Sequence, residues 1–128
     1  MIPNKYIKLS LITFCFFLTS CYEQQRNCTD FKNGEFQFSQ EIDGKLETST
    51  FIRTDSLQIE TFRGITDTST VRWINDCEFV LQKLHPKNRA ERKSIHMKIL
   101  TTTTSGYTFE YSFVGETAKQ KGKVTFIK

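Results

Sequence analysis

The chain has 128 residues, of which 38% are hydrophobic and 13% aromatic, with only 6 glycines and 2 prolines. This length suits one domain and is too short for two, and the low glycine and proline content argues against a disordered chain. Without the two lysines of the first 20 residues, 16 of the 18 basic residues remain against 14 acidic ones, a net charge of +2 that predicts no nucleic-acid partner.

The first 20 residues are typical of a bacterial lipoprotein signal peptide. A basic start with Lys5 and Lys8 precedes an apolar run over residues 9–18, and a Leu-Thr-Ser sequence leads directly into Cys21. The run fits a secretory signal of about 7–15 apolar residues and is too short for the roughly 20 of a membrane-spanning helix. We therefore expect cleavage before Cys21 and a diacylglyceryl group on its sulfur. The alternative is a retained membrane helix in which Cys21 is a plain thiol.

This processing divides the chain into a signal peptide (1–20), a lipidated cysteine with a polar tether (21–30) and a folded domain (31–128). Cys28 and Cys77 then remain, and an even pair in an exported protein favours a disulfide. Two free buried thiols and a partial metal site are the alternatives. We expect no metal, because neither cysteine has the close Cys or His partner of a zinc site.

From residue 35 onward, apolar residues alternate with polar ones, which is the period of half-buried strands. Asp43-Gly44 predicts a tight hairpin turn, and further turns are expected at Gly64, Asn75-Asp76, Ser105-Gly106 and Gly115-Glu116. A charged connection over residues 86–93 has room for one helical turn. The predicted strands lie around residues 35–39, 46–54, 57–61, 68–74, 77–81, 95–99, 107–113 and 119–127.

Short connections between these strands imply an antiparallel up-and-down meander. A meander of about eight strands usually closes into a barrel, because open strand edges invite aggregation. We therefore predict an all-β fold, a small lipocalin-like barrel or half-barrel. Its inward positions are rich in Phe and Ile, so we expect bulky side chains to fill the interior and leave little free volume.

Four aromatic residues are candidates for lining a ligand pocket if the barrel is open: Trp73, Phe79, Phe109 and Tyr111. In that case the protein would carry a small apolar ligand. The other interpretation makes Trp73 a core anchor beside the disulfide, and we favour it because a buried indole is a large packing element.

The connection between the fifth and sixth strands carries the main basic cluster, formed by Lys87, Arg89, Arg92 and Lys93. It fits contact with phosphate groups or with an acidic partner, although a solvated loop is the commoner explanation. His85 and His96 flank this connection without a carboxylate cluster, so the sequence predicts no metal site there either.

The sequence contains no catalytic signature. It lacks a Gly-x-Ser-x-Gly elbow, a Walker loop and a His-Glu-x-x-His motif. Glu60, Glu78 and Glu110 fall opposite the apolar residues of their strands, so we expect them to face solvent or to pair across strands. We therefore predict a protein that is not an enzyme and needs no cofactor.

Three segments, residues 72–78, 95–100 and 107–111, resemble a family of small Gram-negative envelope lipoproteins that often carry the name DNA topoisomerase IV. The resemblance covers most of the chain from Cys28 to Lys128. A type II topoisomerase needs an ATP-binding domain, a DNA-cleaving tyrosine and a magnesium site, which 108 exported residues cannot hold. We therefore expect that name to be a mislabel, and no catalytic residue is transferred from it.

Together these patterns predict a lipid-anchored envelope protein that acts as a non-enzymatic interaction or binding module. Tyr22, rather than an aspartate, follows the lipidated cysteine, which favours the outer membrane. Tethering would raise the effective concentration of the domain near its partners. The expected partners are the membrane, through the lipid, and an envelope protein. The alternative is a lipocalin-like carrier of a small apolar ligand.

Overall fold

The computed structural model describes residues 25–128, so the predicted signal peptide and the predicted lipidation site at Cys21 lie outside the described residues. Within this range no helix is long and apolar enough to cross a membrane. The elements are two short 3-10 helices and eight strands, in the order η2 (Cys28–Phe31), β1 (Gly34–Ile42), β2 (Lys45–Arg53), β3 (Leu57–Phe62), β4 (Ile65–Asn75), β5 (Glu78–Lys83), η3 (Ala90–Arg92), β6 (Ile95–Thr103), β7 (Gly106–Phe113) and β8 (Gln120–Phe126).

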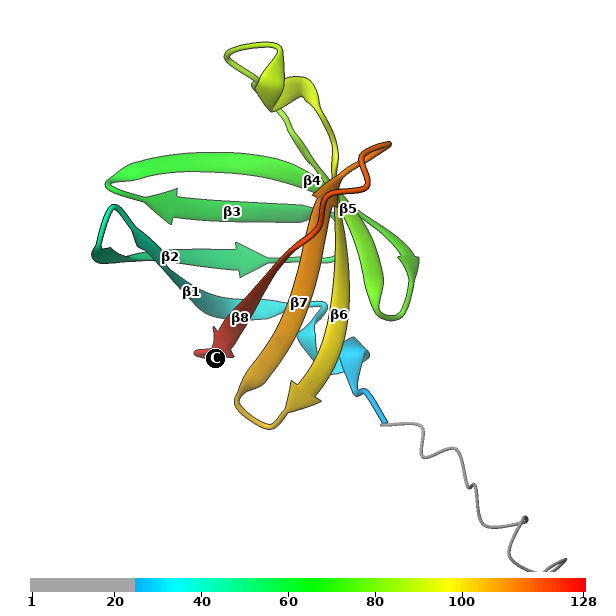
Figure 1. Cartoon of the computed structure of the whole chain (residues 1–128). Helices are drawn as coiled ribbons and strands as arrows, with labels where there is room; N and C mark the ends of the chain where they lie inside the picture. The colour runs from blue at the N-terminus through cyan, green and yellow to red at the C-terminus, as the bar shows by residue number, and fades with distance from the viewer. Residues whose placement is uncertain (1–24) are drawn as a thin grey trace, which may run out of the picture.

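Each strand pairs with its neighbours in the chain, and β8 returns to β1, so the sheet closes into an up-and-down barrel. The predicted all-β meander of eight strands is therefore confirmed. In Figure 1, β2 and β3 run across the view while β6 and β7 run down it, so the two halves of the barrel cross. The closing ladder between β1 and β8 is short, from Phe36–Phe126 to Phe38–Val124, and beyond it the two strands no longer pair with each other.

Turn chemistry explains two of the hairpins. Asp43 and Gly44 both have positive φ angles, 51° and 77°, and so do Arg63 and Gly64, at 50° and 76°. Two consecutive residues in this region form the tight turn whose twist matches antiparallel strands. The predicted turn at Asp43-Gly44 is confirmed. The second turn carries the ladder on without a break, so β4 begins at Ile65, earlier than the sequence pattern indicated.

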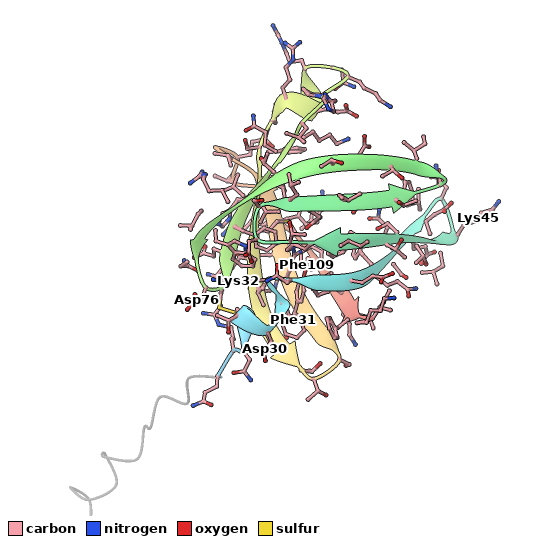
Figure 2. The ribbon with its side chains drawn as sticks, turned by 180° about the vertical axis from the view of Figure 1, so that it is seen from behind. Asp30, Phe31, Lys32, Lys45, Asp76 and Phe109 are labelled. Carbon is pink, nitrogen blue, oxygen red and sulfur yellow. A yellow bond between two sulfur atoms is a disulfide. The ribbon has the colours of Figure 1, made fainter. Side chains whose placement is uncertain are left out.

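A packed apolar core fills one end of the barrel, which we call the closed end. Its ring centroids are close together: Phe36 stacks on Phe51 at 5.1 Å, and Phe31 lies 5.4 Å from Tyr107. Phe31 belongs to η2, which covers this end like a plug. Figure 2 shows Phe31 at the closed end, with Phe109 further inside the barrel.

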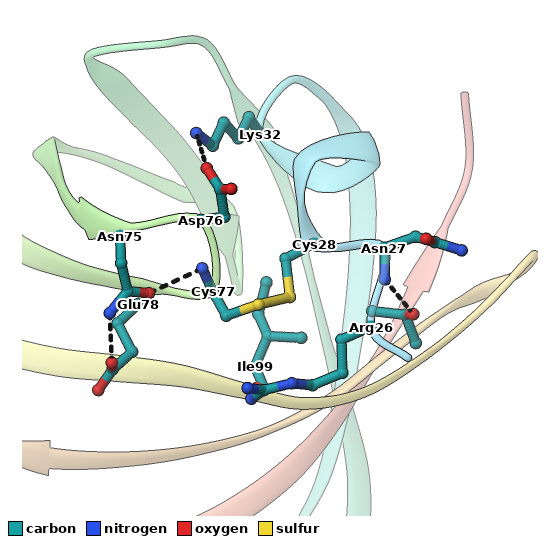
Figure 3. Close-up of a disulfide and its surroundings, with 10 residues drawn as sticks. Arg26, Asn27, Cys28, Lys32, Asn75, Asp76, Cys77, Glu78 and Ile99 are labelled. Atoms are coloured by element: carbon teal, nitrogen blue, oxygen red, sulfur yellow. Dashed lines mark hydrogen bonds and ion pairs between the residues drawn. A yellow bond between two sulfur atoms is a disulfide. The ribbon is translucent and has the colours of Figure 1, made fainter. Parts of the chain in front are cut away.

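The disulfide joins the plug to the barrel wall. Cys28 of η2 and Cys77 of the β4–β5 turn are bonded, with their Cα atoms 5.2 Å apart, so the predicted pairing is confirmed. Cys28, which we expected at the end of the tether, is fully buried in the core. Lys32 forms an ion pair with Asp76 at 3.2 Å on the other side of the same junction (Figure 3).

The chain enters and leaves the barrel at the closed end. The Arg26 guanidinium donates a hydrogen bond to the carbonyl oxygen of Ile99 at 2.8 Å. At the other terminus, the backbone N–H of Glu35 donates to the carbonyl oxygen of Lys128 at 2.7 Å. The opposite end is formed by the β1–β2, β3–β4, β5–β6 and β7–β8 connections, and it lies away from both ends of the described range, residues 25 and 128.

Candidate binding cavity

The half of the barrel away from the plug encloses a cavity of about 280 Å³. The expectation that bulky side chains fill the interior therefore holds only at the closed end. The reason lies in the inward positions near the other end, where β1, β3, β4 and β5 carry polar residues instead of large apolar ones: Gln40, Glu60, Asp67, Ser69 and Lys83.

Apolar side chains form the wall of the cavity around its middle: Phe38, Leu81, Ile95, Met97, Phe109 and Tyr111. The rings of Phe38 and Phe109 meet edge to face at 5.6 Å. A Cβ atom at Gly122 would lie 2.7 Å from the Phe109 ring and 2.9 Å from the Phe38 ring. The absence of a side chain at Gly122 therefore gives these two rings their place in the wall.

Charged residues surround the mouth of the cavity. The Lys83 ammonium lies 3.1 Å from a Glu91 carboxylate oxygen and 3.5 Å from one of Asp67. Lys93 pairs with Glu116 at 3.0 Å. Both mouth lysines are therefore already matched with carboxylates, and their charges hold the β5–β6 connection against β4 and the β7–β8 connection.

Glu60 also lines the cavity, which corrects the expectation that it faces away from the interior. Burial raises the pKa of its carboxyl group, and the Asp67 charge adds to the rise while Lys83 opposes it. On β3 it is the polar residues, Gln58 and Glu60, that point inward, and Ile59 lies outside with 38% of its surface exposed. Hydrophobicity alone assigned the two faces of this strand the wrong way round.

Arg53 forms the floor of the cavity and is only 1% exposed. Its guanidinium donates hydrogen bonds to Gln58 Oε1 at 3.0 Å, to the Phe31 carbonyl oxygen at 2.8 Å and to the Tyr107 hydroxyl oxygen at 2.8 Å. It also lies 4.5 Å from the ring centroid of Phe79, within the range of a cation–π contact. Among residues 25–128, no carboxylate lies within ion-pair distance of Arg53.

Tyr107 is the second polar group of the floor. Burial raises the pKa of its hydroxyl, and the positive charge and hydrogen bond of Arg53 partly offset this rise. Tyr107 therefore stays neutral at physiological pH, so its hydroxyl keeps a proton that it can donate.

The four aromatic residues singled out in the sequence divide into two pairs. Phe109 and Tyr111 line the cavity, whereas Trp73 and Phe79 lie outside its lining. Trp73 and Phe79 pack against each other with ring centroids 4.5 Å apart, on the closed-end side of Arg53. The indole Nε1 of Trp73 is buried, and it has no hydrogen-bond partner in the part of the chain that the structure describes.

The basic cluster is split by its position. Lys93 lies at the mouth of the cavity, while Lys87, Arg89 and Arg92 are exposed on the β5–β6 connection and do not line it. In Figure 1 this connection rises above the barrel with η3 at its tip. The structure therefore brings only one of the four basic residues to the candidate site.

The other expected polar residues lie on the outside of the barrel. Glu78 pairs with His96 at 3.1 Å, and the hydrogen bond from the Asn75 side chain is the main cause that lowers the Glu78 pKa. Glu110 pairs with Lys119 at 3.4 Å. Across residues 25–128, no group of three or more His, Cys, Asp or Glu side chains is placed to hold a metal ion.

The sequence pattern did not predict Arg53 as a site residue, although it contains one signal for an inward-facing Arg53. Ser49, Phe51 and Arg53 share one phase of the alternation on β2, and all three are buried. The other phase ends in Ile52, which is 50% exposed but apolar, so hydrophobicity did not distinguish the two faces.

In comparisons with known proteins, the chain matches no family model, no curated protein and no solved structure.

Proposed function

We propose that this protein is a non-enzymatic binding module that takes up one small ligand inside its barrel. The observation that carries the proposal is the cavity of about 280 Å³ at the end of the barrel opposite the plug. Ligand pockets usually measure about 300–1,000 Å³, so this cavity suits a small molecule rather than a long lipid.

The lining supports a ligand that is apolar along its body and polar at one end. Aromatic and aliphatic side chains surround the middle of the cavity, where they would remove an apolar body from water. Polar groups lie at both ends, with Arg53 and Tyr107 at the floor and Lys83, Glu60 and Asp67 at the mouth. A few placed polar groups in an apolar pocket are what fixes the orientation of a small ligand.

We further propose that the module is anchored in the cell envelope, in the outer membrane, through a lipid on Cys21. Arg26 is held at the closed end by its bond to Ile99, and only four residues separate it from Cys21. Five extended steps reach at most about 17 Å. The lipid would therefore attach on the plug side, and the mouth of the cavity would face away from the membrane.

The direct test is native mass spectrometry of the lipoprotein purified from its own envelope. We expect a bound small molecule that is lost from Ser69→Phe, because Ser69 lines the cavity and a phenyl ring there would fill it. Thr70→Phe is the matched control, since the neighbouring residue lies outside the cavity lining and its hydroxyl donates to the Gln82 carbonyl oxygen. A ligand that survives Ser69→Phe, or an empty wild-type protein that takes up no probe molecule in vitro, would contradict the proposal.

The second candidate function is an interaction module for an acidic envelope protein. It is favoured by the exposed side chains of Lys87, Arg89 and Arg92 on the raised β5–β6 connection. Crosslinking in intact cells distinguishes the two functions. A protein partner that is lost in Arg89→Glu with Arg92→Glu, but kept in Ser69→Phe, would favour the interaction module.

A further inference from the structure

We propose that the floor of the cavity binds a carboxylate, and that the ligand is a small carboxylic acid whose apolar tail points toward the mouth. This inference rests on the proposed ligand-binding function. The group that would receive the carboxylate is the guanidinium of Arg53, assisted by the hydroxyl of Tyr107. Both residues are buried and both line the cavity.

Arg53 has more hydrogen-bond donors than the described part of the chain has acceptors for them. A guanidinium carries five N–H groups, and the described residues supply three acceptors: Gln58 Oε1, the Phe31 carbonyl oxygen and the Tyr107 hydroxyl oxygen. Tyr107 accepts from Arg53, and its own O–H donates to no acceptor in the part of the chain that the structure describes. Two N–H groups and one O–H are therefore left over at the floor.

Arg53 is also a buried cation that has no counter-ion among residues 25–128. A charge removed from water is costly unless it is paired and hydrogen-bonded. Three neutral acceptors and several aromatic rings, of which Phe79 at 4.5 Å and Phe36 at 5.1 Å lie nearest, offset part of this cost. A carboxylate would supply the missing charge and accept two hydrogen bonds at once in the fork geometry of an arginine.

The mouth is a poorer place for an anionic head group. Lys83 and Lys93 already pair with carboxylates, so neither offers a free positive charge. Glu60 adds a carboxyl group that has no ion-pair partner among residues 25–128. A ligand carboxylate at the mouth would therefore meet like charges, whereas at the floor it would meet the positive charge of Arg53 and the neutral hydroxyl of Tyr107. Head-first binding also places the tail against the ring of Phe109 and the side chain of Met97.

The first experiment compares octanoate with octanol, which share a tail and differ in the charge of the head group. The mature chain from residue 21 is used, with Cys21→Ser so that no lipid is attached, and binding is followed by titration calorimetry. We expect octanoate to bind about ten- to a hundredfold more tightly, since a hydrogen bond to a charged group contributes that much. Equal binding of octanol would overturn the carboxylate receptor and leave the proposed function standing. Binding of neither would overturn both.

Two matched variants locate the head group. Arg53→Gln should abolish the preference for octanoate over octanol, whereas Lys93→Gln, at the mouth, should keep it. The reverse pattern would place the carboxylate at the mouth and overturn the proposal.

A wild-type measurement covers the case in which Arg53→Gln does not fold. Trp73 is the only tryptophan of the chain, and its ring centroid lies 6.0 Å from the guanidinium carbon of Arg53. Bromine quenches tryptophan fluorescence at short range. We therefore expect α-bromooctanoate to quench Trp73 more strongly than ω-bromooctanoate. Stronger quenching by the ω-bromo compound would show tail-first binding and refute the inference.

Discussion

Removal of the Cys28–Cys77 disulfide should lower the free energy of unfolding by an amount that follows from the length of the loop it closes. Cys28 and Cys77 are separated by 49 residues, and their bond closes a loop that includes β1 to β4. In the chain-entropy account, a loop of this length stabilises the folded state by about 4 kcal/mol, because it restricts the unfolded chain. Small domains are stable by only about 5–15 kcal/mol, so Cys28→Ala with Cys77→Ala should lose a large part of the total.

Equilibrium unfolding in urea, followed by the fluorescence of Trp73, measures this loss. With a slope of about 2 kcal/mol/M, the urea midpoint of the double variant should fall by about 2 M. The wild-type protein under a strong thiol reductant is the matched control and should show the same fall, because it loses the same constraint without losing any side chain.

The plug should remain docked in the folded double variant. Its other contacts do not involve sulfur: Arg53 donates to the Phe31 carbonyl oxygen, and Lys32 pairs with Asp76. A midpoint shift below about 0.5 M would refute the loop-entropy reasoning, since an effect of that size is what the loss of one weak contact produces. A large shift in the double variant with none in the reduced wild type would assign the loss to packing at Cys28 instead.

Three further predictions concern packing, pH and strand faces. Gly106→Ala should cost about 1–3 kcal/mol or more in urea unfolding, because its Cβ atom would lie 2.0 Å from the Val124 carbonyl oxygen and β7 would have to move away from β8; an unchanged midpoint would contradict this close approach. Glu60→Gln should be more stable than wild type at neutral pH. Burial raises the pKa of Glu60 in the folded protein, so the wild type keeps its full free energy of unfolding below the ordinary pKa of 4.5 and loses part of it as the pH rises through the folded-state pKa. The difference between the two proteins should therefore vanish below pH 4.5, and a constant difference at all pH values would show that the ionisation of Glu60 is not its cause. Ile59→Thr should cost less than about 1 kcal/mol because Ile59 faces outward, whereas Phe79→Ala should cost about 3–5 kcal/mol at a fully buried site; similar losses for the two would refute the assignment of faces on β3.

Local signals in the sequence predicted the strands and their order. Asp43-Gly44 marks its turn because few residue pairs adopt two positive φ angles in succession. The alternation of Tyr107, Phe109 and Tyr111 places three aromatic side chains on one face of β7, and the structure has all three pointing inward. Such signals depend on a few neighbouring residues and need no knowledge of the closed barrel.

The cavity could not be predicted in this way, because it depends on which face of each strand closes inward. On β2 and β3 the apolar residues Ile52 and Ile59 lie directly opposite each other across the ladder, and both are on the outside. Their hydrophobicity pointed to the interior, but the registers of all eight strands together place Arg53 and Gln58 there instead. A prediction made for one strand at a time therefore cannot show which residues face the cavity.

The positions where the hydrophobic pattern misleads are therefore the positions that make the site. Sequences usually agree with their folds at every level, and departures concentrate where function demands them. Arg53 and Glu60 are charged residues inside a barrel whose closed end is packed with aromatic rings, and apolar side chains in their place would fill the same space. Because the disulfide and the plug stabilise the closed end, the polar half does not need to contribute a packed core. The closed end therefore holds the fold together, and the other half of the small barrel keeps a cavity that fits the proposed ligand.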